Sequence, residues 1–393
     1  MRRVNVIGVG MTKFTSPKAL RPYTEMGKEA LLDAFKDAGI EYREIEHAYC
    51  GWVYADSCAG QKVLYEVGMT GIPIFNVNNN CSTGSSALFL ARQAVATGLV
   101  ECALALGFEQ MTPGALGIVF SDRPVPMQTF FEKLFEVIPS IEGVAMASML
   151  FGGAGIEHQQ KYGTKKETFA KITVKARKHA EHNERAIFRN LVTLEEVLAS
   201  PMQAPPLTRL QCCPPTCGAA AAIVCSDEFA KKHNISKPIY IAAQSMYTDF
   251  PSAFESRSPM SIIGYDMTAA AAKEVYEKSG IGPEEVNVVE LHDCFTCNEL
   301  VTYEALGLTP EGTAEKFIED GDNTYGGRIV TNPSGGLLSK GHPLGATGLA
   351  QCAELVWQLR GEAGVRQVED ARIGLQQNIG LGGACVVTMY RKD

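Results

Sequence analysis

The sequence is poor in features that mark several classes of protein. Positive charge is not in excess, since 36 Lys and Arg residues face 44 Asp and Glu residues and leave a formal net charge of −8. This balance argues against a nucleic-acid-binding protein, which would carry a strongly basic surface. No run approaches the roughly 18 apolar residues that span a bilayer, and the first residues lack the apolar core of a signal peptide. The sequence therefore predicts no nucleic-acid partner and no membrane span.

What the chain does contain is typical of a globular protein with a sizeable core. Apolar residues make up 46% of its 393 residues and charged residues 20%. Its 12 cysteines are irregularly spaced, and disulfide frameworks belong to small secreted domains. We therefore expect reduced thiols, some of them available for chemistry.

Two pairs of matching segments indicate an internal duplication. Residues 28–51 and 269–292 each read as an amphipathic helix that ends at a glycine, followed by an isoleucine, a short acidic turn and a β-rich run. Residues 81–91 and 342–352 each open a helix that is followed by a strand. Helices that alternate with strands predict an α/β fold, here built from two similar halves.

The duplication divides the chain into three expected parts. These are an N-terminal half (1–113), an inserted lobe without a counterpart in either half (114–239) and a C-terminal half (240–393). Equivalent loops of a duplicated unit lie around a pseudo-twofold axis. Cys81 and His342 occupy equivalent positions, so we expect them to face each other at the centre.

Two of the motifs present a cysteine and a histidine next to helices. Cys81 precedes an apolar helical run, and the partial positive charge and free N–H groups of a helix N-terminus should lower its pKa. A buried structural cysteine is the alternative. His342 lies between Gly341 and Pro343, and a histidine near a cysteine can take its proton. A helix-capping loop with a solvent-facing histidine is the alternative there.

Two further motifs follow apolar strand-like runs. His292 and Cys294 come just after one such run, where α/β proteins place their sites. His292, Cys294 and Cys297 are also possible zinc ligands, but no second pair completes a site, so we expect no metal. The glycine-rich residues 378–383 are interpreted as a backbone wall that supplies N–H donors, or as a plain tight turn between two strands.

Together these motifs resemble those of the thiolase family. The resemblance rests on Asn-x-Cys-Ser-x-Gly around Cys81, on Gly-His-Pro around His342 and on the glycine-rich residues near the C-terminus. The block His-Asp-Cys-Phe at 292–295 is similar to the sterol-carrier-protein type, the thiolase part of sterol carrier protein X. The resemblance covers essentially the whole chain.

The resemblance implies a five-layered αβαβα sandwich of two similar halves with an inserted loop domain. It implies CoA-dependent thiolytic cleavage of 3-oxoacyl-CoA, including branched-chain and sterol side-chain acyl-CoAs, to acetyl-CoA or propionyl-CoA and a shortened acyl-CoA. CoA is then a co-substrate, and no cofactor is needed. Family members form homodimers and many form tetramers. The family habit is peroxisomal, but the chain ends without Ser-Lys-Leu, so the cytoplasm is the alternative location.

The resemblance also implies roles for individual residues. Cys81 is expected to be the nucleophile that takes the acyl group, and His342 to activate it and to donate a hydrogen bond to the enolate oxygen. His292 stands where most thiolases carry the Asn of an Asn-Glu-Ala-Phe block, so we expect it at the same oxyanion site. The backbone N–H groups of Cys81 and Gly380 are expected to form the second oxyanion site.

One residue of the family pattern is missing. Most thiolases move a proton with a cysteine in a Cys-x-Gly loop near the C-terminus, and here that position is Asn378. Cys294 is expected to replace it, with a pKa lowered by His292 and His342. Cys385 is expected to point into the core from the last strand.

The co-substrate site is predicted from a helical pattern. Lys171, Lys175 and Lys178 recur at i, i+4 and i+7, so they would share one helix face and could bind the CoA phosphates. A solvated helix face is the alternative. Two other functions stay open for the whole chain: a condensing synthase of the same fold, and a non-catalytic acyl-CoA or lipid carrier.

Overall fold

The computed structural model describes residues 2–112 and 120–392. Within this part of the chain the main feature is a ten-stranded mixed sheet in the order β10-β9-β11-β12-β8-β1-β7-β4-β2-β3. Its strands are β1 (Val4–Met11), β2 (His47–Gly51), β3 (Ile74–Val77), β4 (Cys102–Glu109), β7 (Gly218–Ser226), β8 (Ile239–Tyr247), β9 (Val288–Glu290), β10 (Val330–Thr331), β11 (Ile373–Gly380) and β12 (Ala384–Arg391). Two further strands, β5 (Met202–Ala204) and β6 (Leu207–Thr208), form a separate ribbon.

The sheet repeats its own topology on the two sides of its centre. From β1 outward, β7 and β4 follow in antiparallel pairings, and β2 and β3 in parallel pairings. From β8 outward, β12 and β11 follow in antiparallel pairings, and β9 and β10 in parallel pairings. The two half-sheets join where β1 pairs with β8 through Asn5–Tyr240 and Val6–Ile239. The predicted duplication is therefore present in the fold.

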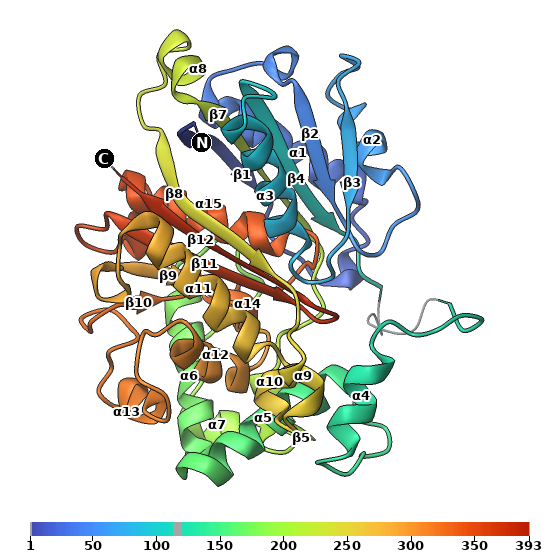
Figure 1. Ribbon diagram of the computed structural model, residues 1–393, viewed down its shortest axis with the longest axis vertical. Helices are drawn as coiled ribbons and strands as arrows, with labels where there is room; N and C mark the ends of the chain where they lie inside the picture. Colours follow the sequence, from blue (N-terminus) through green and yellow to red (C-terminus); the bar gives the residue numbers. More distant parts are fainter. Residues whose placement is uncertain (1, 113–119, 393) are drawn as a thin grey trace.

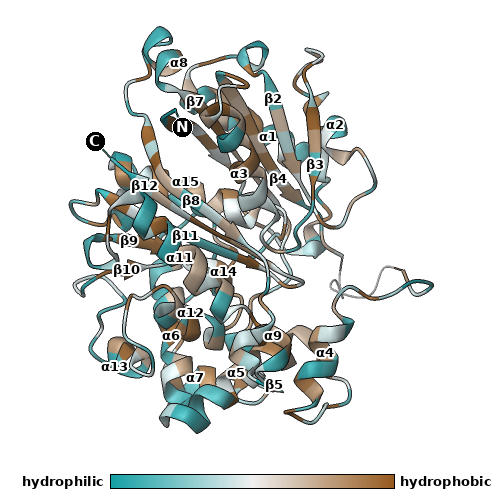
Figure 2. Cartoon of the chain, in the orientation of Figure 1, coloured by the Kyte–Doolittle hydropathy of each residue, from teal (hydrophilic) through white to brown (hydrophobic). Residues whose placement is uncertain are grey.

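Helices separate and cover the two half-sheets in five layers (Figure 1). Helices α3 (Thr83–Ala96) and α15 (Thr347–Arg360) pack against each other and against strands of both halves. Helix α1 (Tyr23–Ala38) covers β1 and β7 on one outer side, and α11 (Tyr265–Ser279) covers β8 and β12 on the other. In Figure 2 the strands around β1 and β4 are mostly brown, whereas the outlying helices α7 and α8 carry more teal. This arrangement is the αβαβα sandwich expected from the sequence.

The two outer helices of the repeat form for the same local reasons. Buried residues of α1, such as Met26, Ala30 and Ala34, recur every three to four positions and face the sheet. The helix ends before Gly39, whose φ of 67° is left-handed, and α11 ends before Gly280 with a φ of 69°. Glycine adopts this conformation without steric cost, which makes it a common C-terminal cap. Both helix ends were predicted from the sequence.

The inserted lobe lies between β4 and β7 in the sequence. It contains α4 (Gln128–Phe135), α5 (Met146–Tyr162), α6 (Lys166–Ala180) and α7 (Leu194–Ala199). Its helices α4, α5 and α7 lie at the lower end of the molecule in Figure 1. The predicted end of this lobe at residue 239 is wrong, because β7 pairs with both β1 and β4 inside the N-terminal half-sheet and corresponds to β12. The predicted boundary between residues 113 and 114 lies outside the described residues. In the C-terminal half, the strands equivalent to β4 and β7 are β11 and β12. A short turn of residues 381–383 connects them in place of the lobe.

The lobe packs on helices of the C-terminal half, since α5 and α6 contact α12 and α6 contacts α14. The remaining helices are α2 (Ala59–Leu64), α8 (Asp227–Lys232), α9 (Ser252–Glu255), α10 (Pro259–Ile262), α12 (Thr296–Ala305), α13 (Ala314–Glu319) and α14 (Gly336–Ser339). Short 3-10 helices cover Pro17–Ala19, Tyr42–Glu44, Arg209–Gln211, Pro283–Glu285 and Gly364–Arg366. In the described ranges we find no helix with the length and apolar character required to cross a bilayer.

Candidate active site

Three side chains from distant parts of the chain converge at the centre of the sandwich. Cys81, His292 and His342 each place one sulfur or ring-nitrogen atom so that all three atoms lie within 4.8 Å of one another. Cys81 immediately precedes the N-terminal cap of α3, His292 follows β9, and His342 lies in the loop between α14 and α15. The expected meeting of Cys81 and His342 is therefore present, and His292 joins them.

The resting state of Cys81 differs from the expectation of a lowered pKa. Burial of the sulfur raises the pKa of Cys81 to about 12, and the negative charge of Glu109 adds to this effect. A backbone hydrogen bond acts in the opposite direction but is outweighed. Desolvation disfavours the charged form of any thiol, and here it is the largest effect on the pKa of Cys81. Cys81 therefore rests as a neutral thiol.

The hydrogen bonds of His342 define its tautomer. Its Nδ1 lies 2.6 Å from Oγ1 of Thr347, and this hydroxyl donates its single hydrogen to the carbonyl oxygen of Pro343 at 2.9 Å. Nδ1 must therefore be the donor, which leaves Nε2 with a free lone pair. Nε2 is buried and has no partner among the described residues. Burial lowers the pKa of His342 to about 3, so the ring is neutral and can accept a proton.

The hydrogen bonds of His292 define the opposite tautomer. The amide Nδ2 of Asn378 lies 2.9 Å from Nδ1 of His292 and also donates to the carbonyl oxygen of Cys81 at 3.2 Å. The amide oxygen of Asn378 accepts from the hydroxyl of Ser85 at 2.8 Å. Nδ1 of His292 is thus an acceptor, and its Nε2 carries the hydrogen. Burial, followed by the influence of His342, lowers the pKa of His292 well below its usual value.

The two histidines therefore differ in what they can do, although both rings are buried and neutral. His342 offers a lone pair that can take the proton of Cys81, and His292 offers an N–H that can stabilise a developing negative charge. Their rings are in edge contact, with centroids 4.9 Å apart. The sequence presents Asn378 as the position of a missing cysteine and as the first residue of the glycine-rich stretch; its part in fixing the His292 tautomer is visible only in the structure.

The same tautomers bear on metal binding. The zinc set considered from the sequence, His292 with Cys294 and Cys297, is not among the clusters that could hold a metal in the described chain; the cluster found there is Cys81, His292 and His342. A histidine binds a metal through an unprotonated nitrogen, but His292 presents Nε2–H while Asn378 donates to Nδ1. In this cluster His292 is therefore arranged to form hydrogen bonds and not to bind a metal.

Buried carboxylates hold the loop that carries His342. Glu290, at the end of β9, forms an ion pair with Lys340 at 3.1 Å, and both side chains are buried. Asp293 accepts hydrogen bonds from the N–H groups of Leu337 and Leu338 at the start of α14, at 2.7 and 3.2 Å. Burial raises the pKa of Asp293 above its usual value. These contacts fasten the segment after β9, which carries His292, to the segment around α14 that leads to His342.

The glycine-rich residues form a hairpin beside Cys81. Gly380 is the last residue of β11, and a Cβ atom there would lie 2.1 Å from the carbonyl oxygen of Asn79. The side-chain amide of Asn80 donates to the carbonyl oxygen of Leu381 at 3.1 Å. The stretch is thus both a tight turn and a wall against the turn that carries Cys81. That the N–H of Gly380 serves as an oxyanion donor stays a prediction.

The two candidate proton-shuttle cysteines have different neighbours. Cys294 is buried, and Cys81 and Cys213 are among the groups whose charge raises its pKa, after burial as the main cause. The predicted downward shift of the Cys294 pKa is therefore wrong. Cys385 lies 3.4 Å from the hydroxyl of Thr268 on α11, in the outer layer, and so points into the core as predicted. All 12 cysteines are unpaired, as expected.

The three lysines predicted to bind CoA do not share a surface. Lys175 is buried, and its ammonium group contacts the carboxylate of Glu299 and donates to Oγ1 of Thr331 at 2.6 Å. Lys171 forms a surface ion pair with Glu319, whereas Lys178 is exposed. The helical spacing correctly predicted that these lysines lie on a helix, α6. It did not show that the face with Lys175 is buried. A common basic stripe for the CoA phosphates is therefore absent.

The different surroundings of these lysines predict different costs of replacement. Lys175→Ala would leave Glu299 buried and unpaired, so we expect it to lower the free energy of unfolding by about 3–5 kcal/mol. Lys171→Ala removes an exposed ion pair and should cost less than about 1 kcal/mol. Urea denaturation of both variants measures the difference. If both variants lost the same free energy of unfolding and both had a raised KM for CoA, the lysines of α6 would be the CoA site after all.

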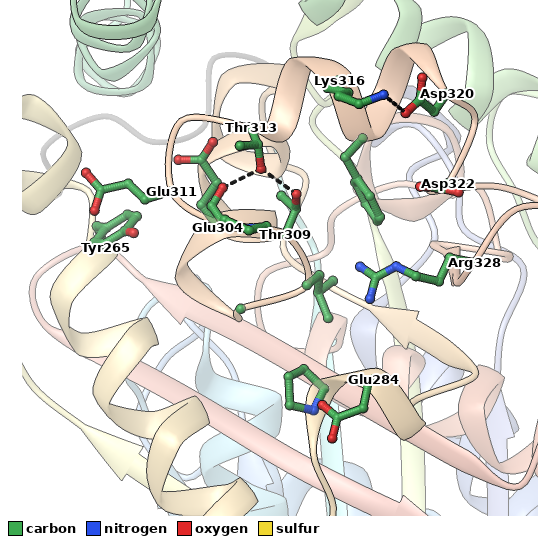
Figure 3. Close-up of a pocket in the computed structure, with 15 residues that line it drawn as sticks. Tyr265, Glu284, Glu304, Thr309, Glu311, Thr313, Lys316, Asp320, Asp322 and Arg328 are labelled. Atoms are coloured by element: carbon green, nitrogen blue, oxygen red, sulfur yellow. Dashed lines mark hydrogen bonds and ion pairs between the residues drawn. The ribbon is translucent and has the colours of Figure 1, made fainter.

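A separate cavity lies on the outside of the C-terminal half (Figure 3). Its volume is 730 Å³, and its walls include Glu284, Glu304 and Glu311 together with Arg328. Lys316 at its rim is paired with Asp320. None of the predicted site residues lines this cavity, so the candidate chemistry belongs to the central cluster.

Comparison with known proteins agrees with this geometry. The model of the family described as "Thiolase, N-terminal domain" matches residues 4–228, and that of "Thiolase C-terminal domain-like" matches residues 253–390. The chain is 55% identical to "Sterol carrier protein 2" of Oryctolagus cuniculus over 99% of its own length and 72% of that protein. It is 37% identical to an "Acetyl-CoA acetyltransferase" of Methanothermobacter thermautotrophicus, with 100% of both chains covered.

Solved structures share the fold. The "Ltp2-ChsH2(DUF35) aldolase" has a TM-score of 0.85 and 24% identity, with 100% of this chain and 98% of that chain covered. Human mitochondrial 3-ketoacyl-CoA thiolase in complex with CoA has a TM-score of 0.72 and 17% identity, with the same coverage. Together with the two family models and the sterol-carrier relatives, these likenesses lead to one conclusion: the chain belongs to the thiolase family of acyltransferases and is similar to its sterol-carrier-protein type.

Proposed function

We propose that this protein catalyses CoA-dependent thiolytic cleavage of a 3-oxoacyl-CoA through an acyl group carried on Cys81. The observation that carries the proposal is the convergence within 4.8 Å of three complementary groups: a thiol, a free imidazole lone pair on His342 and an imidazole N–H on His292. A nucleophile beside a base and a hydrogen-bond donor is the arrangement that acyl transfer requires.

In the first half of the reaction, Nε2 of His342 takes the proton of Cys81 while its sulfur attacks the 3-oxo carbon. The bond between C2 and C3 breaks, and its electrons pass to the enolate of acetyl-CoA or propionyl-CoA. The N–H of His292 and the newly protonated His342 donate to the enolate oxygen. Preorganised donors of this kind contribute roughly 3–4 kcal/mol each. The thiol of Cys294 then protonates C2.

In the second half, the thiol of CoA attacks the acyl group on Cys81. Cys294 regains its proton from CoA, and His342 returns its proton to the departing sulfur of Cys81. The N–H groups of Cys81 and Gly380 would hold the acyl oxygen in both halves. Burial raises the pKa of the Cys294 thiol, so this group rests protonated and carries the proton that it would give to C2.

For the substrate, we propose 3-oxoacyl-CoAs that include branched-chain or sterol side-chain acyl groups. The support is the similarity to proteins named sterol carrier protein 2 and the CoA bound to a structural neighbour. A peroxisomal location stays a prediction from the family resemblance. Steady-state kinetics with straight and 2-methyl-branched 3-oxoacyl-CoAs tests the substrate class, and equal kcat/KM values for the two would reject a branch preference.

A product assay separates thiolysis from the alternatives. Purified protein with 3-oxoacyl-CoA should consume it only when CoA is added, and should yield two acyl-CoA products in equal amounts. A condensing synthase would instead accumulate 3-oxoacyl-CoA from acetyl-CoA. A carrier would bind acyl-CoA without turnover. Cleavage that does not depend on CoA would also reject the proposal.

We further propose a homodimer as the smallest functional unit. The support is the family resemblance, together with the position of β3 at one edge of the sheet, where Phe75 is 45% exposed and stacks on Tyr49. An exposed edge strand offers unpaired backbone groups to a second chain. Sedimentation at micromolar concentration should give at least twice the mass of one chain, and a single monomeric species would exclude the dimer.

A further inference from the structure

Glu109 is a buried acidic residue for which the proposed mechanism has no use. It is the last residue of β4, and in the duplicated fold β4 corresponds to β11, whose last residue is Gly380. Gly380 packs against the turn that carries Cys81. By the pseudo-symmetry, Glu109 stands at the equivalent place beside the loop that carries His342.

The carboxylate of Glu109 joins two loops to the end of β4. Its Oε2 accepts from the N–H groups of Val53 and Gly345, at 3.1 and 3.0 Å, and its Oε1 accepts from the N–H of Tyr54 at 2.8 Å. Gly345 lies three residues after His342 in the same loop. The side chain is fully buried, and no Lys, Arg or His forms a salt bridge with it in the described chain. Within residues 2–112 and 120–392, this charge is therefore held by backbone N–H groups.

The position of this charge matters for the nucleophile. Burial raises the pKa of Glu109 to about 7, against the opposing effect of its three N–H partners, so the group changes charge near neutrality. Besides burial, Glu109 is the one charged group that raises the pKa of Cys81. The other titratable groups around Cys81 are the two histidines, which stay neutral, and the thiols Cys213 and Cys294, whose pKa values lie well above 9.

We propose that Glu109 is a positioning residue that holds the His342 loop in place and, when ionised, adds a negative charge that further disfavours the thiolate of the resting Cys81. The second part concerns the same site as the proposed thiolase reaction but does not need that reaction to be correct. Below about pH 7 Glu109 is mostly neutral and has little effect on Cys81. Above about pH 7 its negative charge opposes the thiolate.

Alkylation of Cys81 by iodoacetamide tests the electrostatic part, because only the thiolate reacts. Glu109→Gln should be alkylated at the wild-type rate at pH 6 and about three- to tenfold faster at pH 8.5, because one pKa unit changes the thiolate fraction tenfold. Its kcat for thiolysis should fall about tenfold, because the amide NH₂ cannot accept from one of the three N–H groups, while KM changes little.

Two matched variants separate charge from structure. Glu304→Gln replaces another buried glutamate, which accepts from the N–H of Ala314 at 3.0 Å and lines the outer cavity; it should keep the wild-type alkylation profile. Glu109→Asp keeps the charge and shortens the side chain, so it should lower kcat without accelerating alkylation. If Glu109→Asp accelerates alkylation as much as Glu109→Gln, loop disorder is the cause and the charge effect is rejected.

The wild-type protein provides a test that does not depend on any variant folding. The logarithm of its alkylation rate should rise with pH, flatten around pH 7 as Glu109 ionises, and rise again above pH 8. A straight line through this range would overturn the proposal. Because alkylation uses no CoA substrate, absence of thiolysis with the expected alkylation profile would reject the proposed function and leave the effect of the Glu109 charge on Cys81 intact.

Discussion

Replacement of Cys81 by serine should lower kcat for 3-oxoacyl-CoA cleavage by at least about 10⁴-fold, since loss of a covalent nucleophile in other enzymes costs up to about 10⁶-fold. A serine hydroxyl is a far weaker acid than the thiol, so His342 cannot prepare it for attack in the same way. The measurement is CoA-dependent disappearance of 3-oxoacyl-CoA, followed by chromatography of the products.

The matched control for this variant is Cys58→Ser. Cys58 is exposed and precedes α2, so its replacement should leave kcat within about twofold of wild type. Circular dichroism of both variants would show that the fold is kept. A Cys81→Ser variant that retains more than a tenth of wild-type turnover would mean that the acyl group is not carried on this residue.

Cys294→Ala is expected to have the second largest effect. We expect kcat to fall about 10²–10⁴-fold, the usual contribution of a general acid or base, because alanine cannot donate a proton to C2. Alkylation of Cys81 should persist, since its thiol and His342 are untouched. Comparison of thiolysis and alkylation in the same preparation measures both expectations.

Cys385→Ala is the informative partner of this variant, because family members usually carry the second cysteine near the C-terminus. The sulfur of Cys385 contacts Thr268 in the outer layer, so its loss should cost stability with little change in kcat. Near-normal turnover of Cys294→Ala together with loss of turnover in Cys385→Ala would reverse the assignment. If Cys213→Ala alone lost most of its kcat, the proton shuttle would instead be Cys213, which neighbours Cys294.

The duplicated fold could be predicted from local patterns, because its signals are local. Each of Gly39 and Gly280 ends an amphipathic helix, and the conformations of both are the left-handed ones that glycine supplies. The match between the segments at Cys81 and His342 then predicted their meeting. The end of the inserted lobe could not be found in this way, since β7 takes its place only by pairing with β1 and β4, which are distant in sequence.

The parts of the site that escaped prediction depend on contacts across the fold. Periodicity placed Lys175 on a helix, but its burial depends on Glu299, which is 124 residues away. The pKa of Cys81 was expected to fall because of a local helix N-terminus, whereas burial by the whole sandwich raises it. The tautomer of His292 depends on Asn378 from another strand. Residue types therefore indicated the candidate reactive groups, and only the packed structure revealed their protonation.

The most direct test of the central claim is the mass of the acyl-enzyme. The protein would be mixed with a 3-oxoacyl-CoA without free CoA, quenched in acid and digested, and the peptide with Cys81 analysed by mass spectrometry. We expect this peptide to gain the mass of the shortened acyl group and to lose it when CoA is added before quenching. Cleavage products without an acyl group on Cys81, or an acyl group on another cysteine, would contradict the account.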